Sequence, residues 1–203
     1  MSKLSGIRVV DLSLFLPGPM MTSMLADHGA EIIKIEPPGG DPARQMEPFE
    51  EGQSVWFRNI NRGKQSVVLD LKQKDNLQKL YRLVEESDIF VEAFRPGVAN
   101  RLEIDYETLS AINPRIIYCS ISAFGQDGPL AHHPAHDLAV EAFAGFMSVN
   151  DKGDGEPVVP AFPAADASAS LVALSGILMA LIGRERTGIG DYLNIAMYDS
   201  LLP

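Results

Sequence analysis

The sequence has little cysteine: one residue, Cys119, in a chain of 203. A single thiol cannot close an internal disulfide, and no cysteine or histidine cluster has the spacing of a zinc site. Cys119 lies in the apolar segment RIIYCSISAF, which predicts a buried strand and an unreactive core thiol. The fold must therefore depend on an apolar core, which 46% hydrophobic residues can supply.

Positive charge is also scarce. The chain has 17 Lys and Arg against 27 Asp and Glu, a net charge of −10, and a pI of about 4.8. No run of five basic residues is present, which argues against a nucleic-acid partner. An anionic ligand would have to be held locally, by a few Lys or Arg side chains and by backbone N–H groups.

Long hydrophobic runs and nucleotide fingerprints are missing as well. The N-terminus MSKLSGIRVVDL has no apolar signal region, and the most apolar run, Leu171–Ile182, covers 12 residues, fewer than a bilayer requires. We therefore expect a cytoplasmic protein with no membrane partner. No GxGxxG follows the first strand, which disfavours a dinucleotide-dependent oxidoreductase.

What the sequence does have is a regular alternation of short apolar runs and helical patterns. This alternation predicts an α/β fold, a Rossmann-like domain with a mostly parallel sheet flanked by helices. Strands are expected at 7–12, 31–36, 64–71, 89–94 and 114–124, and helices at 20–30 and 72–88, with one or two short helices in 95–113.

The remaining segments are less regular. Residues 41–60 are expected to form an irregular surface loop that shapes a site. The final segment, GDYLNIAMYDSLLP, has the pattern of a strand and the first turn of a helix capped by Asp199 or Ser200, so we expect a truncated chain. A polar loop at 125–137, a helix at 138–149, a turn region at 150–160 and a long apolar helix at 166–186 complete the prediction.

The stretch FPAADASAS places Asp166 directly before that apolar helix. Asp is a favoured helix N-cap, and the helix dipole would lower the carboxyl pKa and keep it ionised. An ionised carboxylate facing an acyl group can act as a nucleophile or a base. Three histidines, His132, His133 and His136, crowd the preceding loop, although a loop histidine is usually just solvated.

Three other stretches follow predicted strands and are candidates for phosphate binding. They are DLSLFLPGPMM, KIEPPGGDPAR with Lys34 and Arg44, and VEAFRPGVANRL with Phe94, Arg95 and Arg101. A loop at the carboxyl end of a parallel strand is a common anion site. Taken singly, each stretch is equally an ordinary turn with surface charges.

Taken together, the motifs are far more specific. The chain resembles the family III CoA-transferases, the carnitine/bile-acid-inducible (CaiB/BaiF) group, to which α-methylacyl-CoA racemase is related. The resemblance implies that residues 1–203 are the N-terminal part of the large CoA-binding domain of the family III fold, with the small domain and the C-terminal return missing. It rests on five stretches in order: GIRVVDLSLFLPGPMMTSMLADHGAEIIKIEPPGGD, NINRGKQSVVLDLK, VEAFRPGVANRL, NPRIIYCSISAFGQDGP and GILMALIGRERTGIGDYLNIAMYDSLL.

The resemblance implies that Asp166 is the nucleophile of a CoA-transferase, which moves CoA from an acyl-CoA thioester to a carboxylic acid through a covalent aspartyl intermediate. In the racemase branch the matching Asp works with a histidine as an acid/base pair, and His136-Asp137 matches that pattern, whereas typical transferases have an aromatic residue at the histidine position. Racemase chemistry by His136 and Asp166 is the alternative. A truncated CoA-binding fragment without turnover is the non-enzyme alternative.

The same resemblance implies a set of CoA contacts and partners. The substrates would be acyl-CoA and a carboxylic acid, with no permanently bound cofactor and no metal, and the protein would be a homodimer of interlaced chains. The implied CoA contacts are Leu14, Phe15, Leu16, Arg44, Leu71, Lys72, Ala93, Phe94, Val98 and Arg101.

Overall fold

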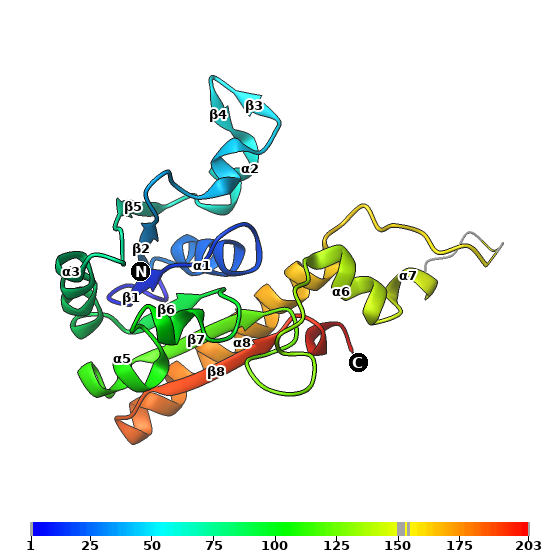
Figure 1. The fold of residues 1–203 in the computed structure, drawn as a ribbon. Helices are drawn as coiled ribbons and strands as arrows, with labels where there is room; N and C mark the ends of the chain where they lie inside the picture. The colour runs from blue at the N-terminus through cyan, green and yellow to red at the C-terminus, as the bar shows by residue number, and fades with distance from the viewer. Residues whose placement is uncertain (1, 150–152, 154, 203) are drawn as a thin grey trace.

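The computed structural model describes residues 2–149, 153 and 155–202. Its centre is a six-stranded parallel sheet with the order β5-β2-β1-β6-β7-β8, visible in Figure 1. The register is continuous across the middle strands, where Val9 pairs with both Ile32 and Ile89. This sheet confirms the predicted α/β fold. The strands are β1 (Arg8–Asp11), β2 (Glu31–Glu36), β5 (Lys64–Val68), β6 (Ile89–Glu92), β7 (Ile117–Ser122) and β8 (Asp191–Ala196).

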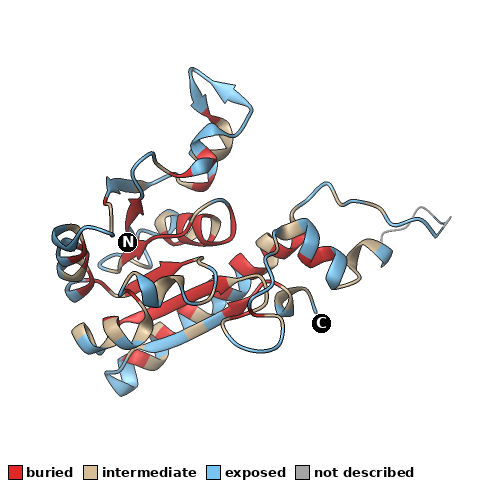
Figure 2. Cartoon of the chain, in the orientation of Figure 1, coloured by how far each residue is buried: buried red, intermediate tan, exposed pale blue. Residues whose placement is uncertain are grey.

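Helices cover both faces of the sheet, so alternate strand residues enter two separate cores. Helices α1 (Pro17–Asp27) and α8 (Ala164–Thr187) pack on one face, against residues such as Ile89 and Val91. Helices α3 (Lys74–Glu85) and α5 (Tyr106–Ile112) pack on the other, against Phe90 among others. Figure 2 shows the central strands almost entirely buried.

Cys119 on β7 is fully buried, as the sequence predicted. Burial raises the pKa of the Cys119 thiol, with Glu92 and Asp11 adding to the shift. A thiol in this state is protonated and unreactive at neutral pH.

The segment 41–60 is more ordered than expected. It contains the 3-10 helix η1 (Pro42–Gln45), the hairpin of β3 (Phe49–Glu50) and β4 (Gln53–Ser54), and helix α2 (Val55–Ile60). Asp41 and Ser54 cap η1 and α2 with their side chains, two local signals that the composition of the segment masked. The hairpin and α2 stand out from the sheet in Figure 1.

The segment after β7 also differs from the prediction. The helix expected at 138–149 is two helices, α6 (Asp137–Phe143) and α7 (Phe146–Val149). They are separated at Gly145, whose φ of 74° ends the first helix. The turn region expected at 150–160 lies partly outside the described residues. Between β6 and α5 lies the short helix α4 (Val98–Arg101).

At the end of the described chain, β8 leads into η2 (Asp199–Leu201), and the residue before it is Tyr198. Asp199 and Ser200 therefore lie inside the 3-10 turn, and the prediction that one of them caps it was wrong.

Helix α8 has 24 residues and is, by length and composition, apolar enough to cross a membrane. The expectation that the run Leu171–Ile182 is too short to do so was therefore wrong for the helix as a whole. Its buried residues include Ala165, Ala169, Ala173 and Ile177, which join the core against the sheet. Small side chains let α8 approach α1 closely, and the Ser170 hydroxyl donates a hydrogen bond of 2.7 Å to the Pro17 carbonyl. Within the fold, α8 serves as the central core helix.

Candidate functional site

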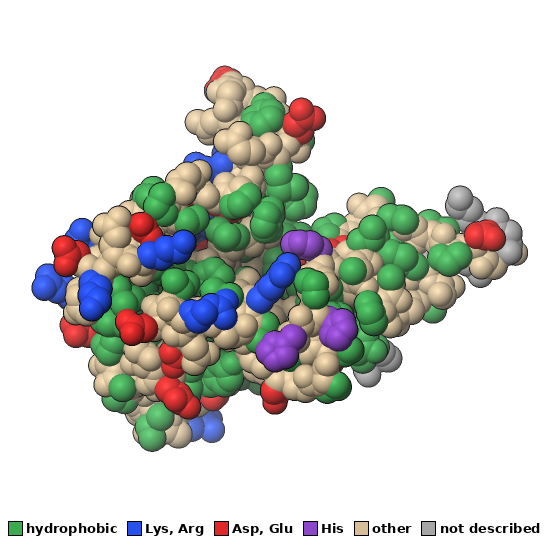
Figure 3. All heavy atoms as spheres, viewed as in Figure 1, with side chains coloured by type: hydrophobic (Ala, Val, Ile, Leu, Met, Phe, Trp, Pro, Cys, Tyr) green, Lys and Arg blue, Asp and Glu red, His purple; other side chains and the backbone are tan. Residues whose placement is uncertain are grey.

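The carboxyl ends of β1, β6 and β7 meet the start of α8 around a cavity of about 380 Å³. A second cavity, of about 430 Å³, adjoins it and shares Leu14 and Phe94 with it. Figure 3 shows Lys, Arg and His side chains gathered on this face of the molecule. The first cavity is lined by Leu14, Phe15, Ala93, Phe94, Val98, Arg101, His136 and Asp166 from the predicted set, and the second adds Leu71 and Lys72.

The structure does not bring two predicted contacts to either cavity. Leu16 is buried in a small cluster with Ala43 and Ile60. Arg44 donates two hydrogen bonds, of 2.8 and 2.6 Å, to the Glu36 carboxylate, and its guanidinium lies 3.9 Å from the centre of the Phe57 ring. The guanidinium of Arg44 is thus already paired with Glu36. Its role in binding a phosphate of CoA stays a prediction.

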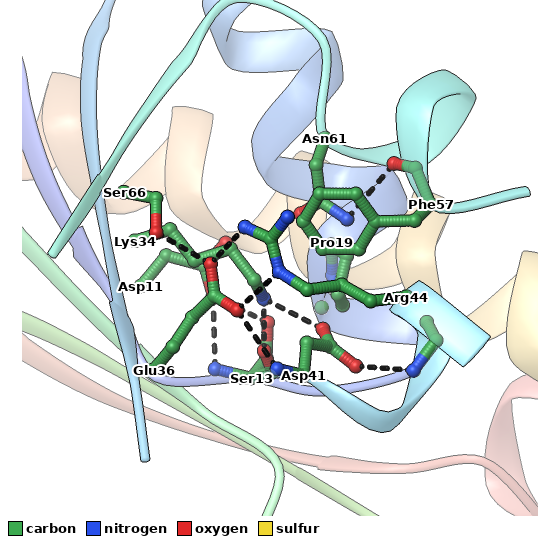
Figure 4. Close-up of polar contacts among 12 residues, drawn as sticks. Asp11, Ser13, Pro19, Lys34, Glu36, Asp41, Arg44, Phe57, Asn61 and Ser66 are labelled. Atoms are coloured by element: carbon green, nitrogen blue, oxygen red, sulfur yellow. Dashed lines mark hydrogen bonds and ion pairs between the residues drawn. The ribbon is translucent and has the colours of Figure 1, made fainter. Parts of the chain in front are cut away.

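Lys34 is not a surface charge or a phosphate contact. Its side chain is 1% exposed, and its Nζ pairs with Asp41 at 2.9 Å and donates to the Ser13 carbonyl at 2.7 Å. Figure 4 shows this network joining the β1–α1 turn to the turn after β2. Lys34 therefore holds the site's framework in place.

Asp11 belongs to the same network. Burial alone would raise its pKa, but Lys64, Lys34 and hydrogen bonds from Ser13 and Thr22 lower the pKa of Asp11 to about 2. The ionised carboxylate pairs with Lys64 at 3.1 Å and accepts the Ser13 N–H at 2.9 Å. The turn that leads to Phe15 is thus fixed by a buried ion pair.

Phe15 stands in the first βα turn with a left-handed backbone conformation, φ 60°. A non-glycine residue in this region stores backbone strain and persists only where the surroundings determine it. The ring is 42% exposed and meets the His136 ring edge to face, with 6.3 Å between the ring centres. Phe15 and His136 therefore form one wall of the first cavity.

Asp166 lines this cavity from the first turn of α8. The helix begins at Ala164, its N-cap position is Pro163, and no side chain of that residue caps it. The prediction that Asp166 is the N-cap was therefore wrong: it is the third helical residue. Small neighbours such as Ala165 and Ala167 are buried, so their size lets the first turn of α8 pack closely against the rest of the fold.

The N–H groups that start α8 are occupied by another helix. The Ala164 N–H donates to Glu141 Oε1 at 2.8 Å, and the Asp166 N–H donates to Asp137 Oδ1 at 2.9 Å. These two donors are therefore paired with side chains of α6 and are not free to stabilise an oxyanion.

The ionisation of Asp166 also differs from the expectation. Burial, with smaller contributions from the charges of Asp137 and Glu141, raises the pKa of Asp166 to about 7. The dipole of α8 favours the anion, but desolvation and two carboxylates outweigh it. The prediction of a lowered pKa was wrong, and the group changes its charge near neutral pH.

His136 is exposed and occupies the N-cap position of α6, with no capping hydrogen bond from its side chain. His132 and His133 line the same cavity. Arg95 and Arg101, on the segment after β6, are exposed and line the same cavity. The site thus combines one partly buried carboxylate with several exposed basic groups, an arrangement suited to an anionic ligand.

Sequence reasoning gave Glu141 no functional role and used Asp137 only as part of the His136-Asp137 pattern. Asp137 and Glu141 are four residues apart, about one turn of a helix, and this spacing predicts that both side chains lie on the same helix face. Their contact with the start of α8 could not be predicted, because Ala164 stands 23 positions after Glu141 in the chain.

Comparison with known proteins agrees with this geometry. A family model described as CoA-transferase family III matches residues 4–203. An acetyl-CoA:oxalate CoA-transferase of Acetobacter aceti is 45% identical over 97% of this chain and 51% of its own length. A succinate–glutarate CoA-transferase of Agrobacterium fabrum is 39% identical over 97% and 51%.

Among solved structures, a CaiB/BaiF family protein from Brucella suis superposes with a TM-score of 0.94 at 37% identity, over 98% of this chain and 54% of that one. The chain spans about half the length of the curated relatives it matches. With its parallel sheet, its cavity at the carboxyl edge and a family match from end to end, the chain belongs to the family III CoA-transferases.

Proposed function

We propose that this chain is the N-terminal part of the large CoA-binding domain of a CoA-transferase, in which Asp166 carries the acyl group and then CoA. The observation that supports this most directly is the shared cavity: Asp166, Phe15, Phe94 and Arg101 all line one space at the carboxyl edge of the sheet. Ligands of open α/β sheets bind at this edge.

In the proposed binding mode, CoA spans both cavities. The second cavity is lined mostly by apolar side chains, with Glu36, Asp70 and Lys72 as its charged members. The apolar part suits an adenine ring, and Lys72 suits a phosphate. Arg101 would pair with a further phosphate, and the pantetheine arm would pass Leu14 and Phe94, which the cavities share. The thioester would then lie near Asp166.

In the proposed reaction, ionised Asp166 attacks the thioester carbonyl, the C–S bond breaks, and CoA thiolate leaves a mixed anhydride on the enzyme. The thiolate then attacks the aspartyl carbonyl, releases the donor acid and forms an aspartyl thioester. The acceptor carboxylate attacks that thioester, and CoA thiolate takes the acceptor acyl group from the second anhydride. The final step regenerates the Asp166 carboxylate, so atoms and charge balance.

Two relatives carry dicarboxylic acids in their names, oxalate and glutarate. Short dicarboxylic acids are therefore the first acceptors to test, and the basic groups around the cavity suit a doubly charged acid. The names of these relatives favour transfer over racemisation. We also propose a cytoplasmic location and a homodimer of interlaced chains. Gel filtration tests the homodimer.

The test is acyl exchange. The protein is incubated with an acyl-CoA and a free dicarboxylic acid, and the new acyl-CoA is measured, with hydroxylamine trapping a hydroxamate at Asp166. Transfer is expected to be abolished in Asp166→Ala and retained in His136→Ala. Deuterium wash-in at the α-carbon of a 2-methylacyl-CoA, without acyl exchange, would show racemase chemistry and contradict the proposal.

A further inference from the structure

The start of α8 is held by side chains from outside the helix. A helix leaves its first N–H groups without intrahelical partners, and a nearby side chain usually caps them. Here the residue at the N-cap, Pro163, provides no side-chain cap. Two carboxylates of α6 take its place: Asp137 accepts from the Asp166 N–H and Glu141 accepts from the Ala164 N–H. The position of Asp166 therefore depends on α6.

Glu141 is unusual for an acidic residue because it is only 1% exposed. Its Oε1 accepts the Ala164 N–H, while Oε2 is buried and finds no hydrogen-bond partner in the described part of the chain. Burial and the neighbouring Asp137, by charge and hydrogen bond, raise the pKa of Glu141. Glu141 is therefore held between Asp137 and the first turn of α8.

The charged groups facing Asp166 come from three segments. Asp137 and Glu141 face it from α6. To the lining of the same cavity, the loop before α6 supplies His132, His133 and His136, and the segment after β6 supplies Arg95 and Arg101. The basic groups are exposed and screened by solvent, whereas Glu141 is buried and Asp137 is half-buried. The α6 carboxylates therefore act on Asp166 more strongly than the basic groups do.

We propose that Asp137 and Glu141 are positioning residues that hold the first turn of α8 and together set how firmly Asp166 keeps its proton. The proposal rests on the function proposed for Asp166 and adds the control of its reactivity.

The test compares isosteric neutral variants. In Glu141→Gln the amide oxygen still accepts the Ala164 N–H and the amide nitrogen can donate to Asp137, so the geometry is kept while the acidic group is lost. Asp137→Asn likewise keeps its acceptor oxygen. The matched control is Glu107→Gln, on the exposed first turn of α5. Titration of the Asp166 carboxyl carbon is followed by NMR with labelled aspartate, a measurement that needs no turnover.

We expect the midpoint of the Asp166 titration to fall by about one pH unit in Asp137→Asn and in Glu141→Gln, as removal of a nearby like charge should do. The control should leave it unchanged. Glu141→Ala, which also removes the N–H acceptor, should lower the melting temperature as well. An Asp166 midpoint that stays in place in both isosteric variants overturns the proposal.

The acid limb of the pH–rate profile for acyl exchange supplies the second readout. In active protein it should move to lower pH by the same amount in both isosteric variants. If the parent shows no exchange although the NMR midpoints move, the positioning role stands and the proposed function fails. If exchange occurs and its acid limb is unmoved, the positioning role fails and the function stands.

Discussion

Replacing Asp166 with Asn should make the protein more stable at alkaline pH. The pKa of Asp166 is raised from 3.8 to about 7, so the folded state holds this proton more tightly than the unfolded state does. As the pH rises through this interval, the unfolded chain ionises first and the free energy of unfolding falls. Asn has no charge to desolvate, and the variant therefore avoids this loss.

The size of the effect follows from the shift. A change of roughly three pKa units, at about 1.4 kcal/mol each, sets an upper limit of about 4 kcal/mol at pH 8. Asp166 is only half-buried, and solvent screens part of that charge, so we expect about 1–2 kcal/mol. In a domain of this size that corresponds to a rise in melting temperature of about 2–8 °C.

The assay is urea unfolding of both proteins at pH values from 4 to 8. The stability curves should converge near pH 4 and separate steadily up to pH 8. Asp75→Asn is the matched control, because Asp75 is an exposed residue in the first turn of α3; losing its favourable dipole interaction should lower stability slightly. If Asp166→Asn is no more stable than the parent at pH 8, the reasoning on burial and like charge is refuted.

Further predictions concern CoA binding, the core and the thiol. Arg101→Ala should weaken CoA binding about tenfold or more, because a charge-assisted phosphate contact is lost. Calorimetry measures the affinity, and the control Arg82→Ala on α3 should bind CoA as the parent does. If Arg101→Ala and the parent bind CoA equally well, the contact is excluded. Arg184→Ala should destabilise the fold by about 1–3 kcal/mol, because it removes a buried guanidinium that pairs with Asp88 at 2.8 Å and donates to the Arg115 carbonyl. A loss below about 1 kcal/mol by urea unfolding would contradict this. Cys119 should not react with a thiol reagent until urea unfolds the chain, and labelling in the native state would count against its burial.

The alternation of strands and helices was predictable because each element carries its own periodicity. On β6, Ile89 and Val91 enter one core and Phe90 enters the other, as expected for a parallel sheet covered on both faces. The hairpin of β3 and β4 was missed because strands of two residues have no periodicity to detect. Local pattern is sufficient for long elements and insufficient for short ones.

The sequence predicted most of the residues that line the site, but the prediction of their electrostatics was wrong. Most of the residues matched by motif line the two cavities, since strand ends converge at one edge of a sheet. The ionisation of Asp166 depends on its burial and then on Asp137 and Glu141, which stand 29 and 25 positions earlier in the chain. Lys34 and Asp41 are only seven positions apart, but their ion pair depends on how the turn after β2 folds back on the strand, and the residue pattern does not show that.

The order of the strands has a kinetic consequence. Every neighbouring pair in the main sheet is parallel, and β1 lies between β2 and β6. The β7–β8 pairing joins strands that α6, α7 and α8 separate along the chain. Such pairings close long loops before their contacts are gained, which makes folding slow. The cavity draws its walls from segments near residues 15, 95, 133 and 166. Ligand binding should therefore appear in the last phase of refolding, later than most of the helical signal.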